Sequence, residues 1–410
     1  GWLYQFYISE KKDEVIGKVV KSEDIPAATQ LFTPNWIVKY MVQNTIGAQW
    51  LATYPDSPLR KQMEFYIEPA EQSDEVNAKL AEITPTSLNP EELTLMDPAC
   101  GSGHILVEAY EIFKAIYLEQ GYQLREIPKL IFEKNLFGLD IDKRAAQLTI
   151  FALMMKGRAD DRRLFGRDIK IKVMALQNSA DFEPTILEQQ INFSIYDLNL
   201  SDLTELKRIY KTATTFGSLI EPREGLTAKL PAMKQLSEAP NQELLLSEDL
   251  KGLHLLVRQT EMLAAHYDAV VANPPYIGSK AQTSKLKDFL KAKYKKYEKD
   301  VFSAFIKRNL VFSKENGRIG LMTPFVWMFI SSYKGLRDEL INKEFIASLI
   351  QLEYSGFEGA TVPVCTFSLQ KCRQAGQKGC YIRLSDFKGS SRQAPKTLEA
   401  IKDRDCGWLF

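Results

Sequence analysis

The sequence predicts an α/β protein with a doubly wound, mostly parallel sheet of about seven strands, an N-terminal helical region and a helical insertion. From residue 93 onward, short apolar segments alternate with amphipathic helical segments, which is the βαβ pattern of a parallel sheet. Two polar motifs, at 97–103 and 273–276, each directly follow such an apolar segment. Because ligands of open α/β sheets bind where the strands end, both motifs are expected at one binding edge.

The expected strands are short apolar or β-branched segments bounded by turn or helix patterns. They are expected at residues 93–97, 136–142, 170–177, 267–272, 318–323, 346–353 and 362–370. Ahead of them, a helix is expected to begin after Thr33-Pro34, with Thr33 as its cap and Pro34 at its first position.

The strand and helix alternation is interrupted once, and the chain therefore divides into five expected regions. After residue 182 the strand pattern gives way to amphipathic helical segments, which we interpret as an insertion. The regions are a helical one at 1–92, one half of the sheet domain at 93–181, the insertion at 182–266, the other half at 267–371, and the start of a C-terminal region at 372–410.

Composition excludes several classes of protein. Among 410 residues, 45% hydrophobic and 26% charged, no apolar run is long enough to span a membrane, so a soluble, cytoplasmic protein is expected. Five cysteines without a CxxC pair and three scattered histidines favour neither a disulfide framework nor a metal site. The net charge of +1 argues against nucleic-acid binding by overall charge, but not by a local patch.

The first motif, Asp97-Pro98-Ala99-Cys100-Gly101-Ser102-Gly103, is expected to form a strand-to-helix turn. Its glycines let backbone amides approach a ligand closely at the start of a helix. The Asp97 carboxylate can hold an ammonium group while the turn amides donate to a carboxylate, which matches the amino-acid end of S-adenosylmethionine. The cofactor-binding candidates are Asp97, Pro98, Ala99, Gly101 and Gly103. The alternative is a tight turn without a ligand.

Acidic and amide side chains follow the next two strands. Asp140 ends the second strand, where nucleotide-binding sheets place an acid that accepts hydrogen bonds from ribose hydroxyls. The alternative role is a helix cap, for which Asp142 is better placed because the helix begins at Lys143. After the third strand, either Asn178 or Asp181 is expected to meet the adenine amine of the cofactor, and the sequence does not choose between them.

The second motif, Asn273-Pro274-Pro275-Tyr276, is predicted to carry the chemistry. An exocyclic amine on an aromatic base is a poor nucleophile because its lone pair is delocalised into the ring. The Asn273 amide oxygen and the Pro274 carbonyl can both accept from such an amine and so orient its lone pair. Pro275 stiffens the backbone, and Tyr276 offers a flat face for a flipped-out base. Taken alone, the tetrapeptide could also be a strand end with a rigid turn.

A lysine cluster with interleaved aromatic residues follows the second motif. Its lysines are Lys280, Lys285, Lys287, Lys291, Lys293, Lys295, Lys296 and Lys299. Such a cluster is either a solvated helix face or, so close to a base-binding motif, a set of phosphate contacts.

Together these motifs resemble the adenine-directed, amino-methylating DNA methyltransferases of the NPPY type, over most of the chain. The segment 31–38 looks like the family's cofactor-closing motif, which adds Thr33 to the cofactor-binding candidates; 97–103 looks like its glycine motif and 138–142 like its ribose motif. The segment 356–359 looks like the late motif whose aromatic residue packs against the flipped adenine, so Phe357 joins Tyr276 as a base-binding candidate. An ordinary loop-anchoring role for Phe357 is the alternative.

The segment 27–34, together with the insertion, is similar to the PglX family of BREX phage-defence methyltransferases. This resemblance implies an enzyme that uses S-adenosylmethionine to methylate adenine in host DNA as a self mark. Its expected partners are double-stranded DNA, other defence-system proteins and a phage-encoded inhibitor, but no membrane. The resemblance also implies a C-terminal target-recognition domain, which we expect to be absent from this segment.

Two other functions stay open. One is a protein glutamine methyltransferase, which also carries an NPPY motif, although the early motif, the insertion and the lysine cluster favour DNA. The other is a catalytically silent DNA-binding or effector-binding subunit that kept its cofactor pocket. Methylation of a cytosine ring carbon is disfavoured, because it needs a nucleophilic cysteine after a proline and position 276 is tyrosine.

Overall fold

One sheet of eight strands organises the protein, in the order β3-β2-β1-β4-β5-β7-β6-β8. The structure is a computed structural model that describes residues 20–21, 24–29, 33–238, 244–356 and 362–410. Its strands are β1 Leu95–Asp97, β2 Leu136–Asp140, β3 Lys172–Ala175, β4 Tyr267–Ala272, β5 Ser313–Pro324, β6 Phe345–Gln351, β7 Val364–Gln370 and β8 Cys380–Arg383. The predicted fold class and the seven predicted strands are confirmed, and the short strand β8 extends the sheet by one.

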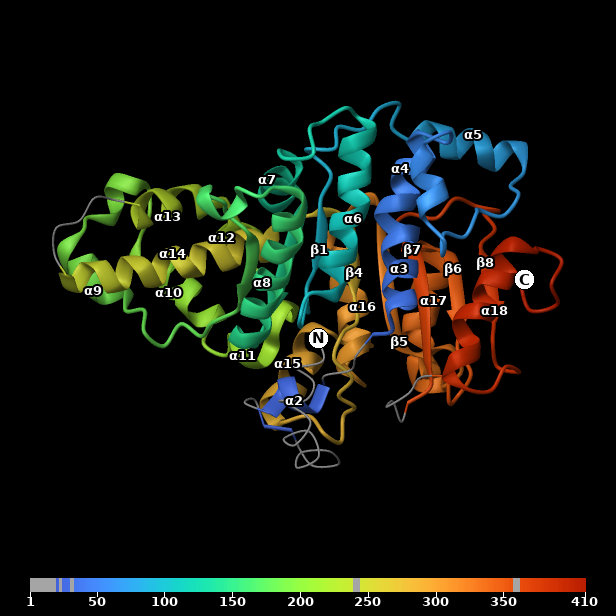
Figure 1. Ribbon diagram of the computed structural model, residues 1–410. Coiled ribbons are helices and arrows are strands. Elements are labelled where there is room, and N and C mark those ends of the chain that lie inside the picture. Colours follow the sequence, from blue (N-terminus) through green and yellow to red (C-terminus); the bar gives the residue numbers. More distant parts are fainter. Residues whose placement is uncertain (1–19, 22–23, 30–32, 239–243, 357–361) are drawn as a thin grey trace.

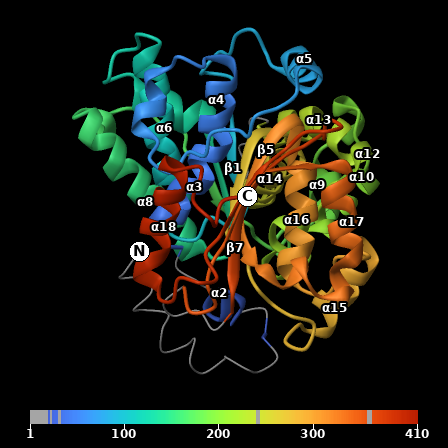
Figure 2. The same cartoon turned by 90° about the vertical axis from the view of Figure 1, so that its right-hand side faces the viewer.

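The first five strands of the chain run parallel, and β7 is antiparallel to both of its neighbours, β5 and β6. Both faces of the sheet are covered, so its central strands are buried along their whole length: all three residues of β1 and all seven of β7 are buried, their polar residues included. Side chains on one face pack against α3, α4, α6, α8 and α18, and those on the other against α14 to α17 (Figures 1 and 2).

The helices fall into three groups along the chain. Before β4 and outside the insertion lie α2 Ile25–Thr29, α3 Asn35–Val42, α4 Ala48–Thr53, α5 Asp74–Ile83, α6 His104–Glu119, α7 Ile127–Leu130 and α8 Lys143–Asp160. Between β3 and β4 lie α9 Pro184–Gln190, α10 Leu200–Ile209, α11 Ala213–Phe216, α12 Glu224–Ala228, α13 Leu230–Ser237 and α14 Leu244–Ala264. After β4 come α15 Ser284–Lys293, α16 Val301–Phe312, α17 Lys334–Lys343 and α18 Ser390–Lys402.

The helices between β3 and β4 gather beyond the β3 end of the sheet (Figure 1). Their buried residues, among them Leu203, Leu206 and Leu253, belong to the same core as the strand face that they adjoin. Within the described part of the chain, no helix is both long enough and apolar enough to cross a bilayer.

The two helix starts predicted from capping residues had different outcomes. Asp142 caps α8, since its Oδ1 accepts from the Arg144 N–H at 2.9 Å, and this prediction is confirmed. The prediction for Thr33 is wrong. Helix α3 begins at Asn35, its N-cap is Pro34 without a side-chain bond, and the Thr33 hydroxyl is engaged elsewhere.

The turn between β1 and α6 requires glycine at position 103. Gly103 has a φ of +86°, in the left-handed region, and a Cβ there would lie 2.9 Å from both Cγ2 and Oγ1 of Thr149 on α8. Thr149 in turn donates from its hydroxyl to the Gly101 carbonyl at 2.8 Å. The first motif is therefore held against α8, and the contact with Thr149 leaves no room for a side chain at position 103.

We expect Gly103→Ala to destabilise the protein by about 1–2 kcal/mol from backbone strain and by a further ~1–3 kcal/mol from the contact with Thr149. Gly121→Ala, at the other end of α6, is the matched control, because Gly121 has a similar φ of +83° with no atom near a Cβ. Urea unfolding of the two variants measures the difference. Equal losses of stability would show that the Thr149 contact contributes nothing.

Candidate active site

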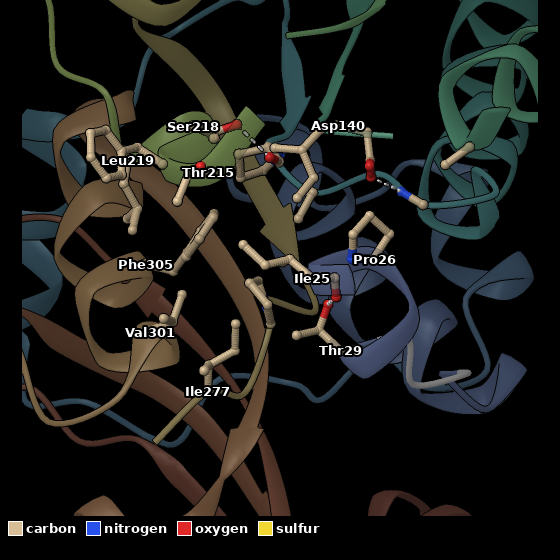
Figure 3. A pocket seen from close by; sticks show the side chains of 18 of the residues that line it. Ile25, Pro26, Thr29, Asp140, Thr215, Ser218, Leu219, Ile277, Val301 and Phe305 are labelled. Carbon is tan, nitrogen blue, oxygen red and sulfur yellow. Dashed lines mark hydrogen bonds between the residues drawn. The ribbon is translucent and has the colours of Figure 1, made fainter. Parts of the chain in front are cut away.

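A pocket opens at the carboxyl ends of β1, β2 and β4 (Figure 3). Six predicted site residues line it: Pro98, Ala99, Gly101, Asp140, Asn273 and Pro275. The remaining lining comes from α2, Ile141, the start of α8, the segment 215–219, Ile277, and residues of α15 and α16. Thr33, Asp97, Gly103, Pro274 and Tyr276 belong to the same motifs but do not line the pocket.

Asp140 joins the ends of β1 and β2. Its Oδ2 accepts from the Gly101 N–H at 2.8 Å, and its Oδ1 accepts from the Asp142 N–H, also at 2.8 Å. Each oxygen of an ionised carboxylate has a further acceptor site, so Asp140 can still receive a ligand hydroxyl. Burial raises the pKa of Asp140 to about 6. Beside it, Gly101 has a φ of +52° and open space where a Cβ would stand, so the turn presents its backbone to the pocket.

Asp97 is a buried acceptor that lacks a donor. The residue is only 1% exposed; its Oδ1 accepts from the Ala99 N–H at 3.1 Å, but its Oδ2 has no hydrogen-bond partner in the described part of the chain. Burial raises the pKa of this carboxyl well above its ordinary value. A buried oxygen without a donor is costly, and a ligand ammonium group would satisfy it and favour its ionised form.

Two neighbours hold the side-chain amide of Asn273. Its Nδ2 donates to the Thr33 hydroxyl at 3.0 Å, and its Oδ1 accepts from the Tyr276 hydroxyl at 2.9 Å. That hydroxyl also contacts the Met322 carbonyl at 3.2 Å, and burial raises the pKa of Tyr276 far above its usual range, so it remains a donor. These two hydrogen bonds fix the plane of the Asn273 amide.

The structure does not bring Asn178 or Asp181 into the pocket lining. Asn178 is exposed, and its Oδ1 accepts from both the backbone N–H and the hydroxyl of Thr214, at 3.1 and 3.3 Å. Asp181 is also exposed. An adenine contact from either residue stays a prediction. Phe357 lies outside the described residues, so its predicted base contact is untested.

The segment 215–219, which sequence reasoning missed, forms one wall of the pocket. Ser218 ties it to the first motif by donating to the Pro98 carbonyl at 2.6 Å. Arg308 of α16, 1% exposed, donates from Nε to the Ser218 carbonyl at 2.8 Å and from Nη2 to the Ile220 carbonyl at 3.0 Å. Tyr294 donates to the Leu219 carbonyl between them at 2.7 Å. The sequence feature that could have indicated this wall is Arg308, a charged residue on the buried face of the otherwise apolar helix α16.

The position of Asp140 predicts how ligand binding depends on pH. Above pH 6 its carboxylate is ionised and accepts from ligand hydroxyls; as pH falls through about 6 it takes up a proton and loses that acceptor strength. We therefore expect the affinity for S-adenosylhomocysteine, measured by calorimetry, to weaken between pH 7.5 and 5. The same proton uptake stabilises the folded state as pH falls. At pH 5 the Asp140 carboxyl is protonated in the folded protein, whereas in the unfolded chain its pKa is 3.8 and it is still ionised.

Asp140→Asn should weaken binding at pH 7.5 by roughly 1.5–3 kcal/mol and remove the step near pH 6, leaving only the dependence that comes from Asp97. Ser73→Ala is the control, since it removes the cap of α5, whose residues do not line the pocket, and should keep the wild-type profile. If the affinity of Asp140→Asn still fell near pH 6 as in the wild type, the pH step would not come from Asp140.

Comparisons with known proteins identify the family to which the chain belongs. The family described as Eco57I restriction-modification methylase matches residues 134–357, and the MmeI DNA-methyltransferase domain matches residues 70–181. The chain is 47% identical over 411 residues to the adenine-specific methyltransferase BrxX of Escherichia coli O9:H4 (strain HS), covering 94% of this chain and 34% of BrxX. It is 34% identical over 427 residues to the adenine-specific methyltransferase PglX of Lacticaseibacillus casei (strain Zhang), covering 100% of this chain and 35% of PglX.

Among solved structures, the fold is similar to that of the type ISP restriction-modification enzyme LlaGI in complex with a DNA substrate mimic. The TM-score is 0.51 at 13% identity, over 92% of this chain and 26% of LlaGI, and this likeness concerns the fold alone. The chain spans about a third of the length of the curated relatives that it matches. Since the Eco57I family covers more than half of its residues, the chain belongs to the Eco57I restriction-modification methylase family.

Proposed function

We propose that this chain is the catalytic part of an adenine-specific DNA methyltransferase that marks host DNA in a BREX phage-defence system. The observation that supports the proposal is the fixed amide of Asn273 in the same pocket lining as Asp140 and Gly101, beside the motif that carries Asp97. The relatives named BrxX and PglX are adenine-specific methyltransferases, and their likeness extends over nearly the whole chain.

The residues present fit S-adenosylmethionine. The partnerless Oδ2 of Asp97 suits the cofactor's ammonium group, and the amides at the start of α6 suit its carboxylate. Asp140 suits the ribose hydroxyls, and the open face of Gly101 lets the ligand approach the backbone. Bound there, the cofactor supplies an electrophilic methyl group on a sulfonium sulfur.

In this proposal the protein acts by position and hydrogen bonding. The Asn273 Oδ1 accepts from the exocyclic amine of adenine, and Thr33 and Tyr276 keep the amide from rotating away. The Pro274 carbonyl is the second acceptor. As the amine attacks and gains positive charge, both acceptors interact with it more strongly, which stabilises the transition state.

The lysine cluster supports DNA as the substrate. Seven of its eight lysines are exposed, Lys287 is partly so, and none forms an ion pair within the described part of the chain. The interleaved Tyr294 and Tyr297 are each 4% exposed, so they anchor the segment while the lysines face solvent. Unpaired lysines beside a base-binding motif suit the phosphates of a duplex.

We expect Asn273→Ala to lower methyl transfer at least ~100-fold while leaving affinity for S-adenosylhomocysteine little changed, because in this proposal the lost amide binds the target amine and not the cofactor. The measurement is tritium transfer from labelled S-adenosylmethionine to genomic DNA from cells that lack the protein, paired with calorimetry. Asn77→Ala, on the exposed surface of α5, is the control. Single-molecule sequencing of the product identifies the methylated base and its motif. Turnover close to wild type in Asn273→Ala would remove the catalytic assignment.

We expect the chain to bind unrelated duplexes with similar, weak affinities, near 10⁻⁴ to 10⁻⁶ M at physiological salt, and more weakly as salt rises. Changing Lys291, Lys295 and Lys299 together to Gln should weaken binding to all sequences alike and reduce the salt slope, because phosphate contacts do not read bases. Changing Lys61, Lys170 and Lys402, exposed on other elements, is the matched control. Tight, salt-insensitive binding to one duplex would contradict this account.

A further inference from the structure

The connection between β5 and α17 carries two adjacent apolar side chains in solvent. After the short helix η8 Phe325–Met328 comes Phe329, 64% exposed, and then Ile330, 47% exposed. The short helix η9 Ser331–Tyr333 follows and leads into α17. We refer to Phe329 and Ile330 as the apolar tip. Single exposed apolar residues are common, so the tip is informative only through its position and surroundings.

The apolar tip lies at the catalytic edge of the sheet. Strands β4 and β5 are parallel neighbours, with Ala272 paired to Leu321, so their carboxyl ends adjoin. Asn273 follows the end of β4, and η8 begins directly after the end of β5. The Tyr276 hydroxyl reaches across to the Met322 carbonyl of β5, which ties the two connections together.

Hydrogen bonds from α17 and from within the connection hold the loop that carries the tip. Arg337 of α17 donates from Nη1 to the Trp327 carbonyl at 2.7 Å and to the Ile330 carbonyl at 2.6 Å. Trp327, 2% exposed, donates from Nε1 to the Thr323 hydroxyl at 3.1 Å. The loop that carries the tip is therefore held in place before binding, so the entropy cost of ordering it on a partner is small.

Basic residues surround the apolar tip. Lys334 follows it at the start of α17 with a side chain that is 73% exposed and that forms a surface ion pair with Asp338, one turn further along the helix. Lys296 of the lysine cluster packs its side-chain carbons 3.4 Å from where a Cβ of Gly335 would stand, so the cluster adjoins α17 (Figure 2). An apolar projection framed by lysines matches duplex DNA, which is anionic outside and apolar between its stacked bases.

We propose that the apolar tip is a wedge that enters the base stack at the target site and occupies the space that the flipped adenine leaves. This inference rests on the proposed adenine methylation. Enzymes that act on a base inside a duplex must extrude it, and an inserted apolar side chain compensates for the lost stacking. The need for a wedge should be least where the target base is already poorly paired.

The test compares the wild-type protein with the double variant Phe329→Ala/Ile330→Ala on two duplexes that contain its methylated motif. In one duplex the target adenine is paired with thymine, and in the other it faces an abasic site. We expect the variant to lose about 10-fold or more in kcat/KM on the paired duplex and to recover most of that loss on the abasic one. Fluorescence of 2-aminopurine at the target position should show less base flipping by the variant on the paired duplex.

Phe165→Ala is the matched control, because Phe165 is 58% exposed in η5 Leu164–Gly166, after the far end of α8. It should change neither rate. A double variant with wild-type kcat/KM on the paired duplex, or with equal losses on both duplexes, would overturn the wedge while leaving the proposed methylation intact. A wild-type protein that methylates neither duplex would overturn both.

Discussion

The hydrogen bond from the Gly101 N–H to the Asp140 carboxylate is the constraint on which the site depends. It joins the turn after β1 to the end of β2, and the second oxygen of the same carboxylate fixes the backbone that leads into α8. Thr149 of α8 then closes on the turn by bonding to the Gly101 carbonyl. With its backbone held on both sides, the turn keeps an open surface at Gly101 and, at Asp97, a buried carboxylate oxygen that has no hydrogen-bond partner in the described part of the chain. A flexible turn would lose that arrangement to entropy.

A buried cation holds the opposite wall. Within the described chain, Arg308 has no carboxylate partner, and three carbonyls, of Ser218, Ile220 and Leu263, receive its hydrogen bonds instead. The Phe312 ring lies 3.7 Å from its guanidinium carbon, and burial lowers the pKa of Arg308. Carbonyl dipoles and an aromatic face compensate for part of the lost hydration. The segment between β3 and β4 is thereby fixed to α16, so the pocket wall is positioned by an element that follows it in the chain.

The parts of this arrangement that the sequence predicted are those that depend on local pattern. Continuous apolar segments gave the strands, and the strand-to-motif spacing gave the common edge of Gly101, Asp140 and Asn273. The parts that it did not predict depend on contacts between distant residues. Thr33 is a residue type that often caps helices, yet its hydroxyl accepts a hydrogen bond from Asn273, 240 residues away in the sequence. Likewise, Asn178 follows β3 as expected, but its side chain accepts from Thr214 of α11, and residues 215–219 form one wall of the pocket.

The central claim is that this pocket holds the methyl donor beside an oriented Asn273. A crystal structure of the protein with S-adenosylhomocysteine tests it most directly. The account predicts the ligand's ammonium group within hydrogen-bond reach of the Asp97 Oδ2, its ribose hydroxyls at Asp140, and its sulfur facing the Asn273 amide. A ligand bound elsewhere, or one in the pocket with its ammonium group away from Asp97 and its sulfur away from Asn273, would contradict the account.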